Sequence, residues 1–474
     1  MLFNTWQFGL FFVVVFAIYH TLSVRPQNVL LLLASYFFYG CWDYRFLGLI
    51  FVSTAVDFTT SLYMEGAGPR RRRILLWTSV FTNLGILGVF KYFNFFVDSA
   101  SGLLEGLGFQ AHLPILRIVL PVGISFYTFQ TMAYTIDVYR RKLKPTRDLL
   151  LFAVYVSYFP QLVAGPIERP QHLLPQFSAP RRVGTAQLAS GALLVLIGLV
   201  RKVVIADVVA PEVDAAFGDP LNVTSLHLLR AVLLFSLQIY GDFAGYSDIA
   251  RGISRMLGIE LMRNFRHPYF ARSITEFWRR WHISHSTWLR DYLYIPLGGN
   301  RGPRWFVYRN LMLTMLLGGL WHGAAWTFVA WGGLHGLGLV LHKIWQGRRS
   351  RVAPGPPGSL VTGLQIACSW AATMALVGIA WIFFRAPGFH AAWQVITGIV
   401  SLRGFTDTSL AFWSLPFSRM ALVLFLDVPQ FLAGDDAAIL GWPWPVRGLS
   451  YAGLVMALVL LRREISVPFI YFQF

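Results

Sequence analysis

Charged side chains are scarce in this sequence. Of its 474 residues, 13% are charged, 56% are hydrophobic and 16% are aromatic, and the mean hydropathy is +0.55. Soluble domains average about 25% charged residues, so half that fraction cannot cover a water-facing globule of this length. The composition excludes a soluble enzyme, a disordered protein and a fibrous repeat, and it predicts a polytopic membrane protein.

The sequence also lacks several chemical signatures. Only two cysteines are present, Cys41 and Cys368, which excludes a disulfide framework and a thiolate metal cluster. No lysine follows a glycine, so there is no phosphate-binding loop of an ATP-driven pump, and neither HExxH nor GxSxG occurs. The spacing of His282 and His285 suits a metal, but no nearby carboxylate or thiol completes a ligand set, and no metal site is predicted.

Acidic residues are outnumbered by basic ones, 22 against 40, which gives a formal net charge of +18. The basic residues form short runs between apolar segments and no basic tail. Cytoplasmic loops of membrane proteins collect Lys and Arg, and anionic lipids of the inner leaflet favour them there. We therefore expect contacts with membrane lipids and no nucleic-acid partner.

Thirteen apolar runs are candidates for spanning helices, which need about 20 apolar residues. They cover residues 6–22, 28–42, 46–63, 74–97, 121–139, 149–165, 187–206, 226–245, 310–330, 331–346, 362–384, 419–433 and 449–461. The first run has no basic residue before it and no small-residue cleavage site after it, so we interpret it as a retained span. Several runs are short or interrupted, and some of these are expected to be re-entrant or interfacial.

Basic loops set the predicted orientation. They lie at 70–73, 140–147, 348–351 and 462–463, between or after apolar runs. Placing all of them in the cytoplasm puts Met1 outside and the C-terminus inside. An odd number of crossings follows, and eleven fits best. The predicted fold class is an all-α polytopic membrane protein.

Five ionisable residues lie within or beside apolar runs: Asp57, Lys91, Asp137, Asp242 and Asp248. Charged groups at membrane depth cost at least roughly 2.5 kcal/mol and usually face a bundle interior or an aqueous cavity. One interpretation is structural, with hydrogen bonds to neighbouring helices, and we favour it for the first three. For the last two, within GDFAGYSDIARG, a functional interpretation stays equally open because three glycines of that segment permit close backbone approach.

Residues 262–309 are too polar to span a bilayer and too apolar for a free loop. They contain nine arginines against two acids, Glu276 and Asp291, with four interleaved tryptophans. Trp and Arg suit the membrane–water interface, so an amphipathic interfacial helix is one interpretation. The other is a pocket for an anionic cytosolic ligand, because Arg makes bidentate contacts to phosphate. The segment EFWRRWHISHSTWLRDY (276–292) is predicted to be helical, and PLGGNRG (296–302) is predicted to end that helix.

His322 lies in GGLWHGAAWTF (318–328), an apolar run rich in glycine. A neutral imidazole there can accept or donate a proton near neutral pH, and desolvation would hold it neutral, as a general base requires. The alternative is a histidine that only hydrogen-bonds a packed helix.

Together these segments resemble a known family, the membrane-bound O-acyltransferases, in the bacterial branch that includes alginate O-acetylation and teichoic-acid D-alanylation proteins. The resemblance rests on FKYFNFF (90–96), LPVGISFYTFQTMAYTIDVYR (120–140), FPQLVAGPIERP (159–170), GDFAGYSDIARG (241–252), RSITEFWRRWHIS (272–284), STWLRDYLYIPLGGNR (286–301), GGLWHGAAWTF (318–328), WIFFRAP (381–387) and FIYFQF (469–474). It extends from the first span to the last residue, and the RRWHIS and LWHG blocks together are its most specific part.

The resemblance implies that His322 is catalytic and that His282 is the second polar residue of the reaction tunnel. The family usually has an apolar residue at His285, which is expected either as a tolerated interfacial change or as a polar group at the donor opening, and which is not expected to be catalytic. Donor phosphates are expected to meet Arg279, Arg280, Arg290 and Asn264. The expected polar core comprises Asp242, Tyr246, Asp248 and Glu276.

The family fold is a ring of spanning helices around a thinned, funnel-like core with a tunnel. We expect one membrane domain over 1–474, with N-terminal spans (1–120), a catalytic core (121–345) and C-terminal spans (346–474). The predicted location is the bacterial inner membrane.

The implied activity is transfer of an acetyl or other acyl group from a cytosolic thioester to hydroxyls of an exported polysaccharide such as alginate. Acetyl-coenzyme A or another acyl thioester is the expected donor, and no tightly bound cofactor is expected. Periplasmic acetyltransferase proteins are the expected partners for the outer step. A secondary transporter or a non-catalytic export component is the alternative, although no repeated half is visible.

Overall fold

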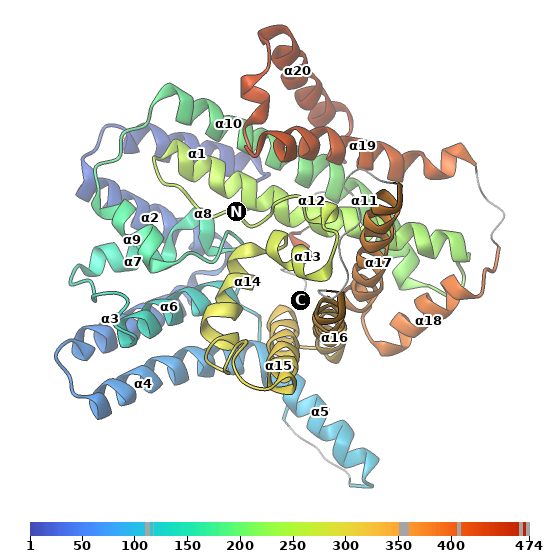
Figure 1. Cartoon of the computed structure of the whole chain (residues 1–474). Helices are drawn as coiled ribbons and strands as arrows, with labels where there is room; N and C mark the ends of the chain where they lie inside the picture. Colours follow the sequence, from blue (N-terminus) through green and yellow to red (C-terminus); the bar gives the residue numbers. More distant parts are fainter. Residues whose placement is uncertain (110–113, 117, 350–359, 405–408, 464–467, 471–474) are drawn as a thin grey trace. The chain divides into compact units, whose positions relative to one another are not determined.

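The computed structural model describes residues 1–109, 114–116, 118–349, 360–404, 409–463 and 468–470 (Figure 1). Within these ranges all regular secondary structure is helical, which confirms the predicted class. Five helical stretches are long and apolar enough to cross a membrane: Val24–Met64, Pro69–Gly106, Ser225–Met256, Val361–Arg385 and Ala411–Ala433. The chain is thus a multi-pass membrane protein, and the number of eleven crossings stays a prediction.

The chain divides into two compact units. The first comprises Met1–Ala192 and Ala250–Met262, and the second comprises Leu193–Ile249 and Arg263–Phe474. Two helices, α10 (Thr185–Leu199) and α12 (Ser225–Met256), contribute residues to both. The segment Phe469–Ile470 and the short helices of the 262–309 region belong to the second unit.

The first unit contains eleven further helical elements. They are α1 (Trp6–Tyr19), α2 (Val24–Asp43), η1 (Tyr44–Phe46), α3 (Leu47–Met64), α4 (Pro69–Leu87), η2 (Gly88–Tyr92), α5 (Phe93–Gly106), α6 (Ile124–Tyr139), α7 (Leu149–Ser157), α8 (Phe159–Leu162) and α9 (Pro170–Ser178). The predicted span 149–165 is broken between α7 and α8, where Pro160 cannot continue the backbone hydrogen bonding.

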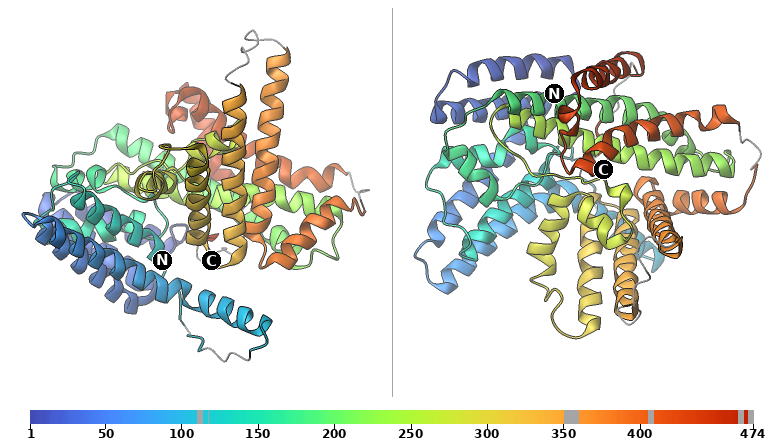
Figure 2. Two further views of the ribbon diagram at one scale, coloured as in Figure 1. Left: turned by 60° about the horizontal axis from the view of Figure 1, so that its bottom comes forward. Right: turned by 45° about the horizontal axis from the view of Figure 1, so that its top comes forward.

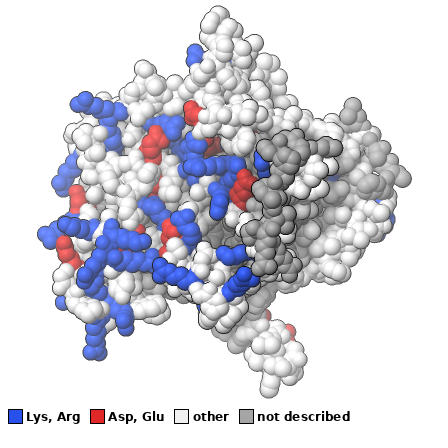
Figure 3. Space-filling view, in the orientation of Figure 1, with Lys and Arg blue, Asp and Glu red and all other residues white. Residues whose placement is uncertain are grey.

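Two basic loops of the first unit lie together. Arg72, at the start of α4, donates hydrogen bonds of 2.8 Å to the carbonyl oxygens of Val138 and Tyr139 at the end of α6. Arg147 forms an ion pair of 3.0 Å with Glu65 at the end of α3. Figure 3 shows basic side chains gathered where α3 and α4 lie in Figure 1. The loops at 70–73 and 140–147 therefore share one side of the unit, as the predicted topology requires.

The ionisable residues of the first unit have structural partners. Asp57 is fully buried, and its carboxylate accepts hydrogen bonds from Ser79 and, at 2.9 Å, from Asn83 on α4. Gln171 donates to Asp137 at 2.5 Å. Lys91 donates to Ser125 at 3.3 Å. The structural interpretation of these three charged residues is confirmed.

The second unit is built from the remaining helices. They are η3 (Val200–Ala206), α11 (Asp207–Gly218), η4 (Pro268–Phe270), α13 (Ile274–Arg280), α14 (Ile283–Leu289), η5 (Arg290–Tyr294), α15 (Arg304–His322), α16 (Trp326–Arg349), α17 (Leu360–Arg385), α18 (Phe389–Val400), α19 (Leu410–Ala433), η6 (Ala438–Gly441) and α20 (Trp444–Leu460).

Helices α15 and α16 form an antiparallel hairpin, seen side by side in both views of Figure 2. Their backbones approach closely at glycines: a Cβ atom on Gly319 would overlap the carbonyl oxygen of Phe328, and one on Gly332 would overlap that of Met315. The two runs predicted at 310–330 and 331–346 are thus confirmed as a helix pair. Their boundary was wrong, because the chain turns at Gly323–Ala325, where Gly323 is extended.

Residues 262–309 fold into short helical pieces rather than one long helix. The predicted helix 276–292 is divided between α13 and α14, each of seven residues, followed by η5. The division falls at His282, whose φ of 41° is left-handed and ends α13. The predicted end at PLGGNRG is confirmed, since Gly298, Gly299 and Gly302 all have positive φ. A seven-residue helix is only about 10 Å long, so neither piece crosses a bilayer.

Candidate active site

Three histidine rings meet in the second unit. His322 is the last residue of α15, His282 is the N-cap of α14, and His285 lies in the first turn of α14. The ring centroid of His285 is 4.8 Å from that of His282 and 5.1 Å from that of His322. His322 and His282 are 6.2 Å apart. The two residues predicted from the RRWHIS and LWHG blocks are therefore neighbours, although forty positions separate them in the chain.

The cluster is withdrawn from solvent. His282 and His285 are completely buried, and His322 is 2% exposed. The expectation that His285 is interfacial or lies at a donor opening is wrong, because the side chain is completely buried and its ring contacts both other imidazoles and, at 4.3 Å, Trp321. His282 and His285 belong to a short helix outside the five candidate spans. Burial lowers the pKa of His282 and lowers the pKa of His285 to about 3, which keeps both rings neutral near pH 7.

Asn264 holds the backbone and side chain of His282. Its carbonyl oxygen accepts a 2.9 Å hydrogen bond from the Ile283 amide, and its Oδ1 accepts one of 2.6 Å from Ser284 Oγ. The same Oδ1 is 3.4 Å from Nδ1 of His282. Because an amide oxygen only accepts, this Nδ1 carries the proton and Nε2 presents a lone pair. The hydrogen bonds made by Asn264 offset the free-energy cost of the left-handed backbone at His282, which is roughly 1–2 kcal/mol.

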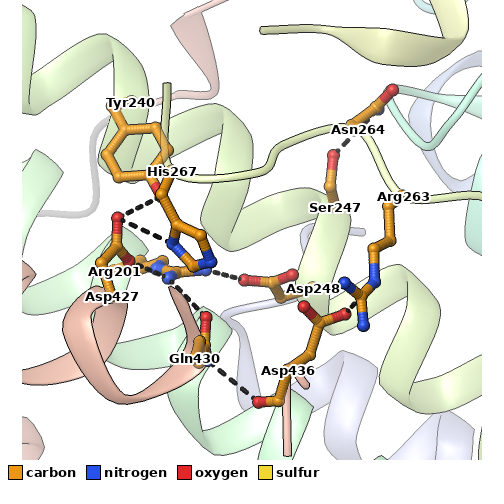
Figure 4. A network of polar contacts seen from close by, with 10 residues as sticks. All are labelled: Arg201, Tyr240, Ser247, Asp248, Arg263, Asn264, His267, Asp427, Gln430 and Asp436. Carbon is orange, nitrogen blue, oxygen red and sulfur yellow. Dashed lines mark hydrogen bonds and ion pairs between the residues drawn. The ribbon is translucent and has the colours of Figure 1, made fainter. Parts of the chain in front are cut away.

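The amide nitrogen of Asn264 donates to Ser247 Oγ on α12 at 3.1 Å, as Figure 4 shows. Asn264 is 1% exposed. The predicted role of this residue in donor binding is therefore not supported by its position. It lies beneath His282 and positions that ring.

The aromatic surroundings of His322 come from three helices. Trp331 of α16 packs edge-on at 4.9 Å, Phe384 of α17 lies at 5.6 Å, and Trp321 precedes it on α15. Apolar rings on these sides exclude water from the imidazole. A water-free site strengthens every electrostatic contact to a bound substrate.

A cavity of about 620 Å³ lies beside this cluster in the second unit. Its lining includes Arg279 from α13, Arg290 from η5, Lys343 from α16 and the indole of Trp278. Among the described residues that line it, three are basic and none is acidic. Ile283 and Ser286 of the same wall are within four residues of His282. A cavity of this size and charge suits an anionic, drug-sized ligand.

The three predicted arginines separate into two groups. Arg279 and Arg290 are exposed and line the cavity, although Arg290 also pairs with Asp291 at 2.7 Å. Arg280 is absent from the lining. Its guanidinium donates to Glu276 at 2.7 Å and lies 5.5 Å from the ring of Phe431. Sequence spacing could not separate these arginines, because consecutive helical residues point in different directions.

Glu276 was predicted to belong to the polar core, and this was wrong. It caps α13: its amide nitrogen donates to Ser273 Oγ at 3.2 Å, and its carboxylate accepts from the Arg272 amide at 2.8 Å. This arrangement resembles a capping box, with the carboxylate bonded to the amide one residue before the N-cap Ser273. The side chain remains 31% exposed and also holds Arg280.

The other three predicted polar-core residues are buried, and the two aspartates among them belong to ion networks. Asp242 forms a 2.7 Å ion pair with Lys202 and accepts a 2.6 Å hydrogen bond from the Ile470 amide. Tyr246 packs at 4.9 Å against Phe469. Asp248 pairs with Arg201, which also pairs with Asp427 of α19 (Figure 4). These contacts tie η3, α12 and α19 together.

The comparisons with known proteins identify the family of the chain. The sequence model of the MBOAT, membrane-bound O-acyltransferase family, matches residues 140–383, which include all three histidines. The chain is 42% identical over 416 residues to a probable alginate O-acetylase of Azotobacter vinelandii, covering 86% of this chain and 80% of that protein. The chain belongs to the membrane-bound O-acyltransferase family. It is an O-acyltransferase.

Two further relatives of this family member cover most of its length. A probable alginate O-acetylase of Pseudomonas putida is 38% identical over 500 residues, covering all of both chains. A peptidoglycan O-acetyltransferase of Helicobacter pylori is 36% identical over 437 residues, covering 85% of this chain and 80% of that protein. The family resemblance found in the sequence motifs is confirmed.

The sequence motifs missed two groups that the site brings together. Lys343 joins the cavity lining, where its Nζ donates to Asn300 at 2.6 Å. His335 lies within the aromatic cluster, 4.7 Å from Trp331. Both fall in an apolar run of α16 in which no motif was apparent. Their signal was a spacing of four residues, since 331, 335, 339 and 343 share one helix face.

Proposed function

We propose that this chain transfers an acetyl or other acyl group from a thioester donor to hydroxyl groups destined for an exported cell-envelope polysaccharide. The observation that carries the proposal is the cluster of three buried imidazoles beside a basic cavity. A thioester is already activated, so the protein needs chiefly a base, orientation and polarisation of the carbonyl.

In the proposed step, His322 takes the proton of the acceptor hydroxyl as its oxygen attacks the thioester carbonyl carbon. The carbon–sulfur bond then breaks, and the sulfur leaves as the thiol when it receives the proton held by His322. His282 orients the site through its hydrogen bond with Asn264. Arg279, Arg290 and Lys343 bind the anionic end of the donor, for which acetyl-coenzyme A is the simplest candidate.

The proposed location is the bacterial inner membrane, with the N-terminus outside and the C-terminus in the cytoplasm. The end of α16 that carries Lys343 and Gln346 of the cavity continues into the basic run at 348–351. Basic loops favour the cytoplasm, so the cavity would open to cytosolic donors. The acceptor would be alginate or a related glycan, reached through periplasmic acetyltransferase proteins. The names of the relatives, alginate O-acetylase and peptidoglycan O-acetyltransferase, support a glycan acceptor.

The test is acyl transfer by the purified protein in lipid nanodiscs, supplied with radiolabelled acetyl-coenzyme A and oligosaccharide or soluble partner acceptors. We expect His322→Ala to lower transfer by about 10²–10⁴-fold. His20→Ala is the matched control, because His20 is an exposed residue of the first unit. Transfer by His322→Ala at the parental rate and yield would overturn the proposal, and a chain that moves solute without acyl transfer would favour a transporter.

A further inference from the structure

A second cavity of the second unit, of about 510 Å³, lies between α16 and α17. The two helices run side by side and are seen together in both views of Figure 2. The cavity wall follows α16 from Gly338 to Trp345 and α17 from Thr362 to Leu376, which is about 21 Å along a helix. It meets a different side of α16 from the basic cavity, which is lined by Lys343. The second cavity is therefore a long groove between two helices.

The two ends of this groove differ in polarity. Near the connection between α16 and α17, its walls carry Trp345, Thr362 and Gln365. At the other end the walls are Gly338 and Leu376, and a Cβ atom on Gly338 would lie 2.5 Å from Cδ2 of Leu376 because the helices are so close there. Tryptophan favours the membrane–water interface. The groove thus suits a ligand with a polar head and an apolar tail.

Apolar side chains of the groove are open to the surroundings. Leu341 is 55% exposed, Trp345 is 47% exposed and Ile366 is 38% exposed. Because α17 is long and apolar enough to cross a membrane, lipids are the molecules that meet this groove. The hydrocarbon of one bilayer leaflet is about 15 Å thick. A groove of about 21 Å therefore has room for one acyl chain and the headgroup beyond it.

Arg272 gives the groove a positive charge. It directly precedes the N-cap of α13 and is the one permanently charged residue among the described residues of the lining. Within the described part of the chain, Arg272 bonds to Glu276 through its backbone amide, and its guanidinium forms no ion pair. The carboxylate of Glu276 is paired with Arg280 instead. Thr275 is bonded to His342 at 2.8 Å, so α13 begins beside the polar half of the groove.

We propose that this groove binds an anionic phospholipid, with its phosphate on Arg272 and an acyl chain that runs between α16 and α17 toward Leu376. A guanidinium binds phosphate through paired hydrogen bonds. The basic run at 348–351 follows the polar end of the groove. Basic runs favour the cytoplasm, and the membrane leaflet on that side carries anionic lipids. A lipid bound there would hold α13, α16 and α17 together.

The experiment uses the purified full chain in detergent, stripped of lipid and titrated with phosphatidylglycerol or phosphatidylcholine. Native mass spectrometry counts the bound lipid, and the melting temperature reports its effect on stability. Phosphatidylglycerol should bind the parent about tenfold more tightly, the effect of one charge-assisted hydrogen bond, because choline offsets the charge of its own phosphate. Arg272→Gln should remove this preference. Arg301→Gln is the matched control and should keep it, because Arg301 is also exposed but lies outside the groove.

A second pair of variants tests the groove itself. Ala372→Trp places an indole in the groove, whereas Ala371→Trp makes the same change at the neighbouring exposed position outside the lining. The first variant should lower the affinity for phosphatidylglycerol by about tenfold or more, and the second should leave it unchanged.

Parental affinity for phosphatidylglycerol in Arg272→Gln or in Ala372→Trp would show that the inference is wrong. Equal protection by glycerol 3-phosphate would also overturn it, since the ligand would then be a soluble phosphate. A parental dimer that Ala372→Trp dissociates, with no preference between the two lipids, would assign the groove to a second copy of this chain instead.

Discussion

The imidazole of His285 stacks on that of His282, with ring centroids 4.8 Å apart and 25° between the planes. His285 therefore belongs to the cluster of three buried histidines by position. A leucine of similar size would fit the same apolar surroundings, so the substitution tests the nitrogen atoms rather than the packing.

We predict that His285→Leu lowers kcat by about tenfold and leaves the KM of the donor unchanged. The reason is that the variant lacks the buried imidazole that contacts His282 and His322. Losing a buried hydrogen-bonding group of this kind costs about 1–3 kcal/mol of free energy. Steady-state kinetics of the purified variant, with yield and melting temperature recorded, measures this. Parental kcat would show that His285 is only a packing residue.

The second prediction concerns Asn264. Asn264→Ala should lower kcat by about 10–100-fold because His282 loses the side-chain acceptor that fixes its tautomer, while the backbone carbonyl that bonds the Ile283 amide remains. Ser284→Ala removes one hydrogen bond to the same Oδ1 and should cost less than tenfold. A raised donor KM at constant kcat would instead place Asn264 in the donor site, as the sequence alone suggested.

The third prediction concerns the ion network of Arg201. Removing one partner of a buried ion pair costs about 3–5 kcal/mol because a buried charge is left uncompensated. Arg201→Met leaves both Asp248 and Asp427 without this guanidinium and should strongly lower the melting temperature or the yield. Arg385→Gln, which breaks a more exposed pair with Asp214, should cost less than about 1 kcal/mol. Equal melting temperatures for the two variants would contradict the structural role.

Some residues of the candidate site could be predicted from the sequence alone, and others could not. His322 and His282 could be predicted because each lies in a distinctive local block, and Asp57 because an acid in an apolar run needs partners. The separation of Arg279 from Arg280 could not, because it depends on which side of α13 meets the cavity. The position of His285 could not either, because the left-handed residue at His282 reorients the chain that follows it. That turn is stabilised by Asn264, eighteen positions earlier, and no local pattern reports such a contact.

The fourth prediction concerns topology. Reporter fusions after Arg73 and after Arg147 should both report the cytoplasm, because the loops are joined by hydrogen bonds from Arg72 to Val138 and Tyr139. A tag before Met1 should report the outer face. Opposite signals from the two fusions would contradict the structure of the first unit, and a shared periplasmic signal would reverse the proposed donor side.

The last prediction uses the separation of the arginines. Arg279→Gln and Arg290→Gln should each raise the KM for acetyl-coenzyme A by about tenfold and change kcat little. The reason is that contacts to a remote phosphate are made equally in the ground state and the transition state, so they act as uniform binding.

Arg280→Gln is the matched control on the same helix. Its guanidinium is held by Glu276 outside the cavity, so its donor KM should stay parental while the capped start of α13 weakens. The measurement is initial rate against acetyl-coenzyme A concentration at equal amounts of folded protein. A KM raised by Arg280→Gln and not by Arg279→Gln would place the anionic end of the donor elsewhere. Lower yields with parental KM for both cavity arginines would show that they anchor a helix to lipid headgroups.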